Sequence, residues 1–302
     1  MIRLASSSSL YSPKQVSRAL GVSESSLKRW CDSGLIRTVR TAGGHRKLTS
    51  ADVLQFARER KLSPVSPEIL GLPPASPLAE RSLEQSTELL ADALLAGDEA
   101  TSAQIVFNLV LAEHPLNRIF DVVVAGAFHL IGDRWACQQA DVYQERRGCE
   151  IMQRILTEVR KSQQSPQGKL IACGGTASGD NYTLPTAMVE VVLRDAGWQA
   201  TSLGTSIPVT SLVRAIQVIR PHLFWLSVSH IADEAEFLER FAQLSAACTA
   251  AGTALVVGGR ALSAELRQRM VYAACCDTLQ QLTAFADSLA RPHRGRGKKS
   301  AR

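Results

Sequence analysis

The spacing of apolar residues near the start of the chain predicts two consecutive helices. The run Ser12-Pro13-Lys14-Gln15 combines a capping box with a proline at the first helical position, so we expect a helix that begins there and ends near Gly21. A second N-cap at Ser23 begins another helix, which Gly34 ends. The buried faces of the two helices are supplied by Val16, Ala19, Leu20, Leu27 and Trp30. Two helices joined by a glycine turn at this spacing form a helix-turn-helix.

The pattern changes three times after this unit. Residues 61–82 carry five prolines, a density that favours an extended spacer over a regular helix. Residues 83–162 have apolar positions at helical spacing and predict a bundle of about four helices. From 168 to 290, short apolar runs such as KLIACGG, HLFWLSVS, ALVVGG and VYAACC alternate with helical stretches, which indicates parallel strands joined by crossover helices.

The expected fold class is therefore multidomain α and α/β, with an N-terminal helix-turn-helix unit, a central four-helix bundle and a C-terminal parallel-sheet domain. The expected boundaries are a flexible N-terminus over 1–9, the helix-turn-helix unit over 10–60, a Pro-rich linker over 61–82, the bundle over 83–162, the α/β domain over 168–290 and a basic disordered tail over 291–302.

Charge separates the two ends of the chain from its middle. The net charge of +6 is the sum of +7 over residues 1–60, −7 over residues 61–290 and +6 over the last twelve residues. Localised positive charge favours a polyanion, because each neutralised phosphate releases condensed counterions. Double-stranded DNA is the expected partner.

Polar and basic side chains surround the predicted helix-turn-helix in two places, the exposed side of its second helix and the loop RTVRTAGGHRKLT. In that loop Gly43-Gly44 permit a tight reversal, so we expect a hairpin that lies along the DNA backbone or minor groove. The candidate DNA contacts are Ser25, Ser26, Lys28, Arg29, Arg40, His45, Arg46 and Lys47.

The segment SPKQVSRALGVSESSLKRW…GLI…GGHRKLTSADV resembles the winged helix-turn-helix of MerR-family regulators, since the turn, the recognition helix, the Gly-Leu-Ile step and the wing fall in order. This resemblance implies a sequence-specific transcriptional regulator, with repression as the expected direction. It also implies a homo-oligomer, a dimer or tetramer, on near-palindromic DNA.

A helical bundle and a flavodoxin-like α/β domain behind such a unit resemble the light-responsive cobalamin-binding repressors of the same family. In that family the α/β domain carries D-x-H-x-x-G, whose His ligates cobalt, followed by a Ser on a later strand and by Gly-Gly. The bundle carries a Trp, nine further residues and then Glu-His above the corrin ring. The resemblance places the cofactor contacts at Trp135, Glu145, Arg146, Asp180, Asn181, Tyr182, Thr183, Ser227, Ser229, Gly258 and Gly259.

Both histidines of the family pattern are replaced in this chain. Tyr182 stands where the cobalt ligand is expected, Arg146 replaces the His above the ring, and Pro185 replaces the motif's Gly. Neutral imidazole is a good cobalt donor, whereas guanidinium cannot ligate and a phenol must first lose its proton. We therefore do not expect cobalamin ligated by a His.

Three interpretations of this half of the chain stay open. It binds a corrinoid without a protein ligand, held by the loop 180–183 and the Gly-Gly turn. Alternatively it binds haem, with His230 or His129 as the ligand. In the third interpretation, which we favour, it binds no cofactor and serves assembly or a protein partner.

Other classes of function depend on residues that the sequence does not display. A corrinoid carrier of a methyl-transfer system uses the same module, but it needs the ligand His or a substrate domain. A purely architectural DNA-binding role is a further alternative. There is no Ser/His/Asp constellation, metal-ligand cluster or phosphate loop with lysine, so we expect neither catalysis nor a metal site. Scattered cysteines, and the lack of an apolar span or secretion signal, indicate a cytoplasmic protein.

Overall fold

The computed structural model describes residues 10–41, 44–60, 62, 65–71, 83–163, 166 and 168–290, without the side chains of residues 58 and 67. The chain divides into two compact units, Met1–Pro166 and Gln167–Arg302. The predicted flexible N-terminus, the predicted basic tail and most of the predicted linker lie outside the described residues. Among the described residues, no helix is both long enough and apolar enough to span a membrane.

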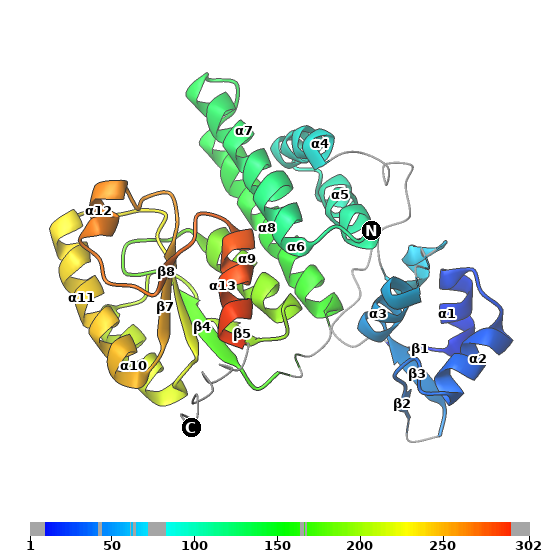
Figure 1. Ribbon diagram of the computed structural model, residues 1–302. Coiled ribbons are helices and arrows are strands. Elements are labelled where there is room, and N and C mark those ends of the chain that lie inside the picture. Colours follow the sequence, from blue (N-terminus) through cyan, green and yellow to red (C-terminus); the bar gives the residue numbers. More distant parts are fainter. Residues whose placement is uncertain are drawn as a thin grey trace, which may run out of the picture. The chain divides into compact units, whose positions relative to one another are not determined.

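The N-terminal part of the first unit is a winged helix-turn-helix (Figure 1). Ser12 accepts a hydrogen bond from the Gln15 backbone N–H, and the Gln15 side chain accepts one from the Ser12 backbone N–H, which confirms the capping box. The wing strands pair antiparallel in the order β1-β3-β2. The elements are β1 Leu10–Tyr11, α1 Pro13–Leu20, α2 Glu24–Asp32, β2 Val39–Arg40, β3 Arg46–Thr49 and α3 Ser50–Arg60.

Part of the predicted linker belongs to this winged unit, which corrects the expectation of an extended spacer over 61–82. Pro67–Leu70 forms a short 3-10 helix, η1, and Leu70 is buried. The Tyr11 hydroxyl donates to the Leu70 carbonyl at 2.6 Å, and the backbone N–H of Val65 donates to the Ala19 carbonyl at 2.8 Å. Proline is tolerated at the start of a helical turn, where its missing N–H is not needed, so proline density alone does not exclude packed structure.

The remainder of the first unit is the predicted helical bundle. Its third helix is built from α6, a π-helical segment η3 and α7, which follow one another without a break. Asp98 caps α5, and Asp141 begins α8 with a second capping box. The bounds are α4 Leu83–Ala96, α5 Glu99–Leu111, α6 Leu116–Arg118, η3 Ile119–Val124, α7 Ala125–Ala136 and α8 Val142–Ser162.

The second unit is a parallel five-stranded sheet with strand order β5-β4-β6-β7-β8. This is the flavodoxin-like order, and it confirms the predicted fold class. The last strand is shorter than its apolar run VYAACC, since only Ala274–Cys275 pairs with β7. The bounds are β4 Ile171–Gly175, α9 Thr183–Asp195, β5 Gln199–Ser202, α10 Val209–Ile219, β6 Leu223–Ser227, α11 Glu234–Ala251, β7 Ala254–Gly258, α12 Ala264–Gln268, β8 Ala274–Cys275 and α13 Leu279–Ala290.

Helices cover both faces of this sheet, with α9 and α13 on one side and α10, α11 and α12 on the other (Figure 1). Because successive side chains of a strand point to opposite faces, β6 sends Trp225 toward α9 and α13 and sends Phe224 and Leu226 toward α10 and α11. Burial raises the pKa of both Cys173 and Cys248 to about 12, so these core thiols stay protonated at neutral pH.

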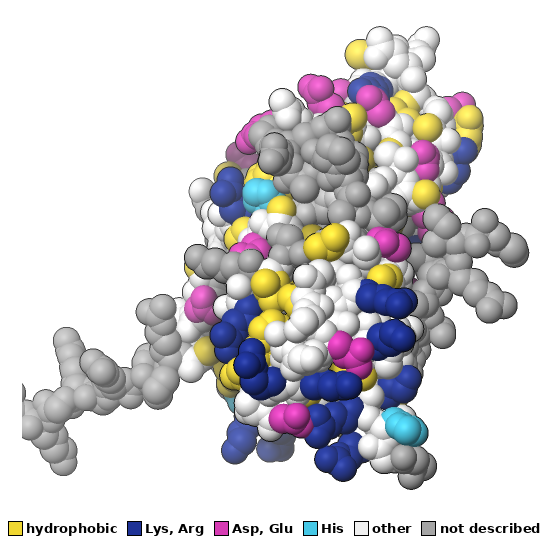
Figure 2. Space-filling model, turned by 90° about the vertical axis from the view of Figure 1, so that its right-hand side faces the viewer, with side chains coloured by type: hydrophobic (Ala, Val, Ile, Leu, Met, Phe, Trp, Pro, Cys, Tyr) yellow, Lys and Arg dark blue, Asp and Glu magenta, His cyan; other side chains and the backbone are white. Residues whose placement is uncertain are grey.

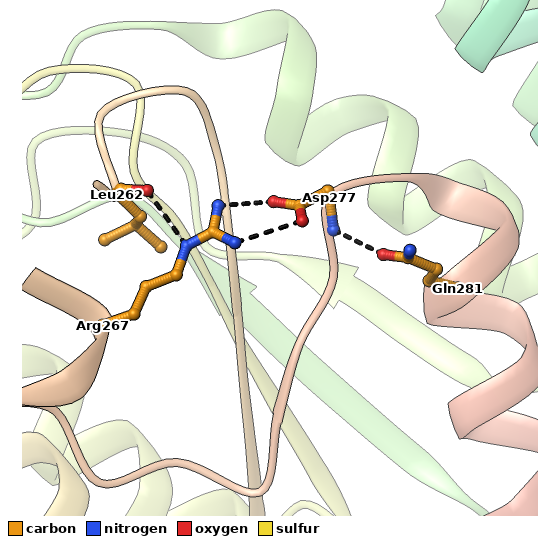
Figure 3. A network of polar contacts seen from close by, with 4 residues as sticks. All are labelled: Leu262, Arg267, Asp277 and Gln281. Atoms are coloured by element: carbon orange, nitrogen blue, oxygen red, sulfur yellow. Dashed lines mark hydrogen bonds and ion pairs between the residues drawn. The ribbon is translucent and has the colours of Figure 1, made fainter. Parts of the chain in front are cut away.

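A bidentate ion pair fixes α12 against the start of α13 (Figure 3). The Arg267 guanidinium donates to both carboxylate oxygens of Asp277 and also to the Leu262 carbonyl, at 3.0 Å. The Asp277 backbone N–H donates to the Gln281 side chain at 2.7 Å. These contacts hold the connections that follow β7 and β8.

Candidate nucleic-acid interface and cobalamin-like positions

The second helix of the winged unit presents a polar outer side. Ser23 caps α2, and its hydroxyl lies 2.9 Å from that of Ser26, so Ser26 takes part in the cap. Lys28 forms an ion pair with Glu24 at 2.9 Å, and this pair lowers the pKa of the Glu24 carboxyl. Ser25 and Arg29 are exposed. The helix can therefore offer Arg29 to DNA directly, whereas Lys28 has to exchange its partner first.

The wing is a hairpin in which Arg40 lies opposite Arg46 and Val39 lies opposite Lys47. Gly44 makes the turn with a φ of 77° and donates to the Thr41 carbonyl at 2.8 Å. Arg40 and His45 are exposed, and Lys47 is half-buried.

Arg46 is a wing cation that has an ion-pair partner inside the unit. It forms an ion pair with Asp32, the last residue of α2, so it joins the wing to that helix. It remains a predicted DNA contact, but one whose charge already has a partner within the unit.

Among the described residues of this unit, sequence reasoning missed four further exposed cations, Lys14, Arg18, Arg37 and Arg60. Lys and Arg side chains gather over the winged unit in Figure 2, with scattered acidic groups between them. Arg37 follows the Gly-Leu-Ile step directly and precedes the wing, and that position could have identified it. Trp30 is half-buried with its ring centroid 5.0 Å from that of Phe56, so it packs inside the unit as predicted.

In the α/β unit, the side chain of Asp180 is bonded to the backbone of its own domain. Asp180 is 2% exposed. Its carboxylate accepts hydrogen bonds from the backbone N–H groups of Tyr182 at 3.1 Å, Ser229 at 2.6 Å and His230 at 3.3 Å. It therefore ties the loop after β4 to the loop after β6.

Tyr182 is held by a side chain from the loop that follows a third strand, β7. The Arg260 guanidinium donates to the Tyr182 hydroxyl at 3.2 Å, and its central carbon lies 5.2 Å from the centre of the tyrosine ring. Arg260 follows β7 and is 78 residues away in sequence. Tyr182 is the N-cap residue of α9, and Pro185 lies in the first turn of that helix as expected.

The glycine pair after β7 is required by close backbone packing. A Cβ at Gly258 would lie 2.4 Å from the Cys276 carbonyl oxygen, and one at Gly259, where φ is 125°, would lie 2.2 Å from the Val228 carbonyl oxygen. These contacts explain the two glycines without a bound nucleotide.

The Trp225 indole packs in the core between the sheet and the helices α9 and α13. Trp225 is 2% exposed, and its Nε1–H donates to the Thr186 hydroxyl at 2.9 Å. The Thr186 hydroxyl in turn lies 3.1 Å from the Ser202 hydroxyl. Ser227 is buried on the same strand, while Asn181 and Thr183 are exposed and Ser229 is half-buried.

The remaining motif positions lie on the bundle. Trp135 is 52% exposed near the end of α7, Arg146 is exposed, and Glu145 is half-buried in the first turn of α8. His129 and His230, the candidate haem ligands, are both exposed and belong to different units. Within the described residues, no group of three or more His, Cys, Asp or Glu side chains could hold a metal ion.

Comparison with known proteins identifies two types of domain, both within the first unit. A helix-turn-helix domain model matches residues 10–61, and a B12 binding domain model matches residues 87–160. The HTH-type transcriptional repressor CarH of Myxococcus xanthus is 25% identical over 248 residues, which cover 76% of this chain and 81% of that protein. The chain resembles the cobalamin-dependent MerR-type repressors.

A solved structure has a fold similar to that of the larger part of this chain. The monomethylamine corrinoid protein of Methanosarcina barkeri aligns over 69% of this chain and 100% of its own length, with a TM-score of 0.56 and 14% identity. These comparisons confirm the prediction of a DNA-binding regulator with a cobalamin-binding-like module. The residues of that module do not fit a cobalamin ligated by imidazole, since Tyr182 bonds to Arg260 and the Asp180 carboxylate is taken up by backbone N–H groups.

Proposed function

We propose that the chain is a transcriptional repressor that binds operator DNA through α2 and the wing as a homo-oligomer. We further propose that its α/β unit works without a His-ligated cobalamin and serves assembly or a protein partner. Neither unit is proposed to carry out catalysis.

The observation that carries the second part of this proposal is the contact between Tyr182 and Arg260. Tyr182 stands at the position of the family's cobalt ligand. Its hydroxyl accepts a hydrogen bond from the Arg260 guanidinium, which also lies over the tyrosine ring. A cation at this position opposes the approach of a metal ion, and the stacked contact between Arg260 and Tyr182 itself contributes to stability. The buried Trp225 and the glycine pair support the same proposal, because packing within the domain accounts for them without a bound nucleotide.

A corrinoid held without a protein ligand is the second candidate, and one observation favours it. The Ser227 side chain is 6% exposed, and its hydroxyl makes no hydrogen bond to the residues that the structure describes. Ser227 lines a cavity, so a bound ligand or a water molecule can reach this residue.

The proposal is tested on the full-length chain purified from cells that make haem and are supplied with hydroxocobalamin. Its absorption spectrum is recorded before and after incubation with each compound. DNA sites are selected from a random-sequence pool, and affinity for the selected site is measured with and without hydroxocobalamin.

We expect a colourless protein that binds a near-palindromic site with an affinity that hydroxocobalamin leaves unchanged. A stoichiometric corrinoid or haem spectrum would overturn the cofactor-free proposal. A chain that enriches no DNA sequence would overturn the regulator proposal. The variant Arg260→Ala frees the tyrosine, and Arg214→Ala, at an exposed position of α10, is its matched control. Cofactor binding by Arg260→Ala alone would show that the Arg260 guanidinium is what excludes the cofactor.

A further inference from the structure

A cavity of about 50 Å³ opens at the carboxyl end of β6, between α10 and α11. That volume is several times what one water molecule requires. The loop after β4 and the loop after β6 both contribute to its wall. In an open parallel sheet, ligands bind at the carboxyl edge between two neighbouring strands whose following helices lie on opposite faces of the sheet. Here those two strands are β4 and β6.

The cavity lies on the opposite side of the sheet from Trp225. Of the positions that match the cobalamin motifs, Asp180 and Ser227 also line it, whereas Tyr182, Ser229 and the glycine pair do not. It is therefore a different place in the fold from the contact between Tyr182 and Arg260.

The inner wall is apolar and partly aromatic. Leu212 of α10, Leu226 of β6 and Leu244 of α11 belong to the buried core of this face. Phe237 and Phe241 lie above them with ring centroids 6.0 Å apart and planes tilted by 26°. Such a wall suits a ring-sized apolar body, and aromatic faces also attract cations.

The mouth of the cavity is rich in hydrogen-bond acceptors. Asp233 caps α11 through one carboxylate oxygen, which accepts from the Glu236 backbone N–H at 2.8 Å. Glu236 forms an ion pair with Arg240, so that guanidinium is already matched by a carboxylate. The other groups around the mouth are Ser178, the His230 imidazole and the Asp180 carboxylate, which the backbone N–H groups satisfy. Asp233 is left as the carboxylate without a cationic partner among the described residues.

We propose that this cavity binds a small organic cation, an amine with a ring-sized apolar body. The apolar part packs against Phe237, Phe241 and the leucines, and the ammonium group donates to Asp233 at the mouth. The site does not depend on DNA binding, so the proposal stands or falls separately from the proposed function.

The test uses three probes of similar shape, 2-phenylethylamine, 2-phenylethanol and phenylacetate, with isothermal titration calorimetry on the full-length chain without DNA. We expect saturable one-to-one binding of the amine at millimolar concentrations or below, with the alcohol weaker and phenylacetate weakest. Asp233→Asn keeps the helix cap and removes the charge, so it should weaken amine binding by about tenfold and leave binding of the alcohol unchanged. Ala232→Trp, at the exposed rim, should abolish binding of all three probes.

Asp98→Asn is the matched control, because Asp98 caps α5 of the other unit in the same way. Its amine affinity should equal that of the wild type, and thermal unfolding checks that each variant is folded. Absence of saturable binding for every probe would overturn the site. Equal binding of the amine and phenylacetate, or an unchanged amine affinity in folded Asp233→Asn, would overturn the assignment of a cation.

Discussion

The winged unit and the α/β unit both match a family pattern in sequence, but they use their matching side chains differently. In the winged unit, Arg29, Arg40 and His45 are exposed to solvent. In the α/β unit, Asp180 and Tyr182 bond to partners within the domain. These three side chains of the winged unit are accessible to a ligand, whereas Asp180 and Tyr182 are bonded within their own domain.

This difference is what the cofactor-free proposal requires of the α/β unit. A buried carboxylate or a loop tyrosine that loses its external partner must find another one, since an unpaired buried polar group is costly. Arg260 and the backbone N–H groups of Ser229 and His230 supply those partners here. These contacts connect the loops that follow β4, β6 and β7 at the carboxyl edge of the sheet.

The largest expected effect tests whether Trp225 is scaffold. We expect Trp225→Ala to lower the free energy of unfolding of the α/β unit by about 3–5 kcal/mol, because it leaves a cavity in the core and removes the donor to Thr186. Urea unfolding followed by circular dichroism measures the loss. Trp135→Ala is the matched control at a 52% exposed site and should change stability little. Equal small losses in both variants would contradict the scaffold role.

The next effect tests whether the cations of the winged unit are available to DNA. We expect the double variant Arg29→Ala/Arg40→Ala to bind its selected site roughly tenfold to a hundredfold more weakly. The slope of log affinity against log salt should fall in magnitude by about 0.9 for each phosphate that the variant no longer neutralises. Fluorescence anisotropy at several salt concentrations measures both quantities.

The control for that experiment is Arg118→Ala/Arg214→Ala, which removes the same charge from exposed positions of the bundle and of α10. Its salt slope should equal that of the wild type. If the control variant loses as much affinity as Arg29→Ala/Arg40→Ala, net charge rather than position controls binding.

The sequence predicted those features that local chemistry determines. Ser12 and Gln15 specify a capping box wherever they stand at the head of a helix, and both predicted hydrogen bonds form. The apolar runs predicted β4 to β7 and the parallel class, because buried strands need little more than their own composition. The extent of α2 followed in the same way from its cap at Ser23 and its break at Gly34.

Contacts between distant residues could not be predicted in this way. Arg260 meets Tyr182 only because β4 and β7 end at the same edge of the sheet. Gly258 and Gly259 match a cofactor motif, yet the Cys276 and Val228 carbonyl oxygens explain their lack of side chains. Val65 reaches the Ala19 carbonyl in a segment whose prolines predicted a spacer. In each case the deciding partner is remote in sequence.

A smaller effect tests whether Arg46 belongs with the free cations or with the scaffold. We expect Asp32→Asn to strengthen DNA binding by up to about fivefold, because it releases Arg46 and removes a negative charge near the phosphates. The measurement is the same anisotropy titration. Asp92→Asn is the matched control, since Asp92 pairs with Arg134 in the bundle, and it should leave affinity unchanged. Weaker binding in Asp32→Asn would show that Arg46 acts by holding the wing to α2.

The smallest effect concerns the pair that fixes α12. The Arg267 guanidinium lowers the pKa of the Asp277 carboxyl below its ordinary value of 3.8. A carboxyl whose pKa is lowered in the folded state adds stability at pH values above its unfolded pKa. That stability is lost as the pH falls through the folded pKa.

We therefore expect Asp277→Asn to reduce the free energy of unfolding at neutral pH by less than about 1 kcal/mol, as for other exposed ion pairs. The deficit should disappear in acid, because the wild-type carboxyl is then uncharged as well. Urea unfolding at neutral pH and at a pH below the folded pKa measures it, with Asp287→Asn on exposed α13 as the control. A deficit of the same size at both pH values would mean that the charge of Asp277 does not account for its contribution to stability. The contact with Arg267 would then act through hydrogen-bond geometry and packing.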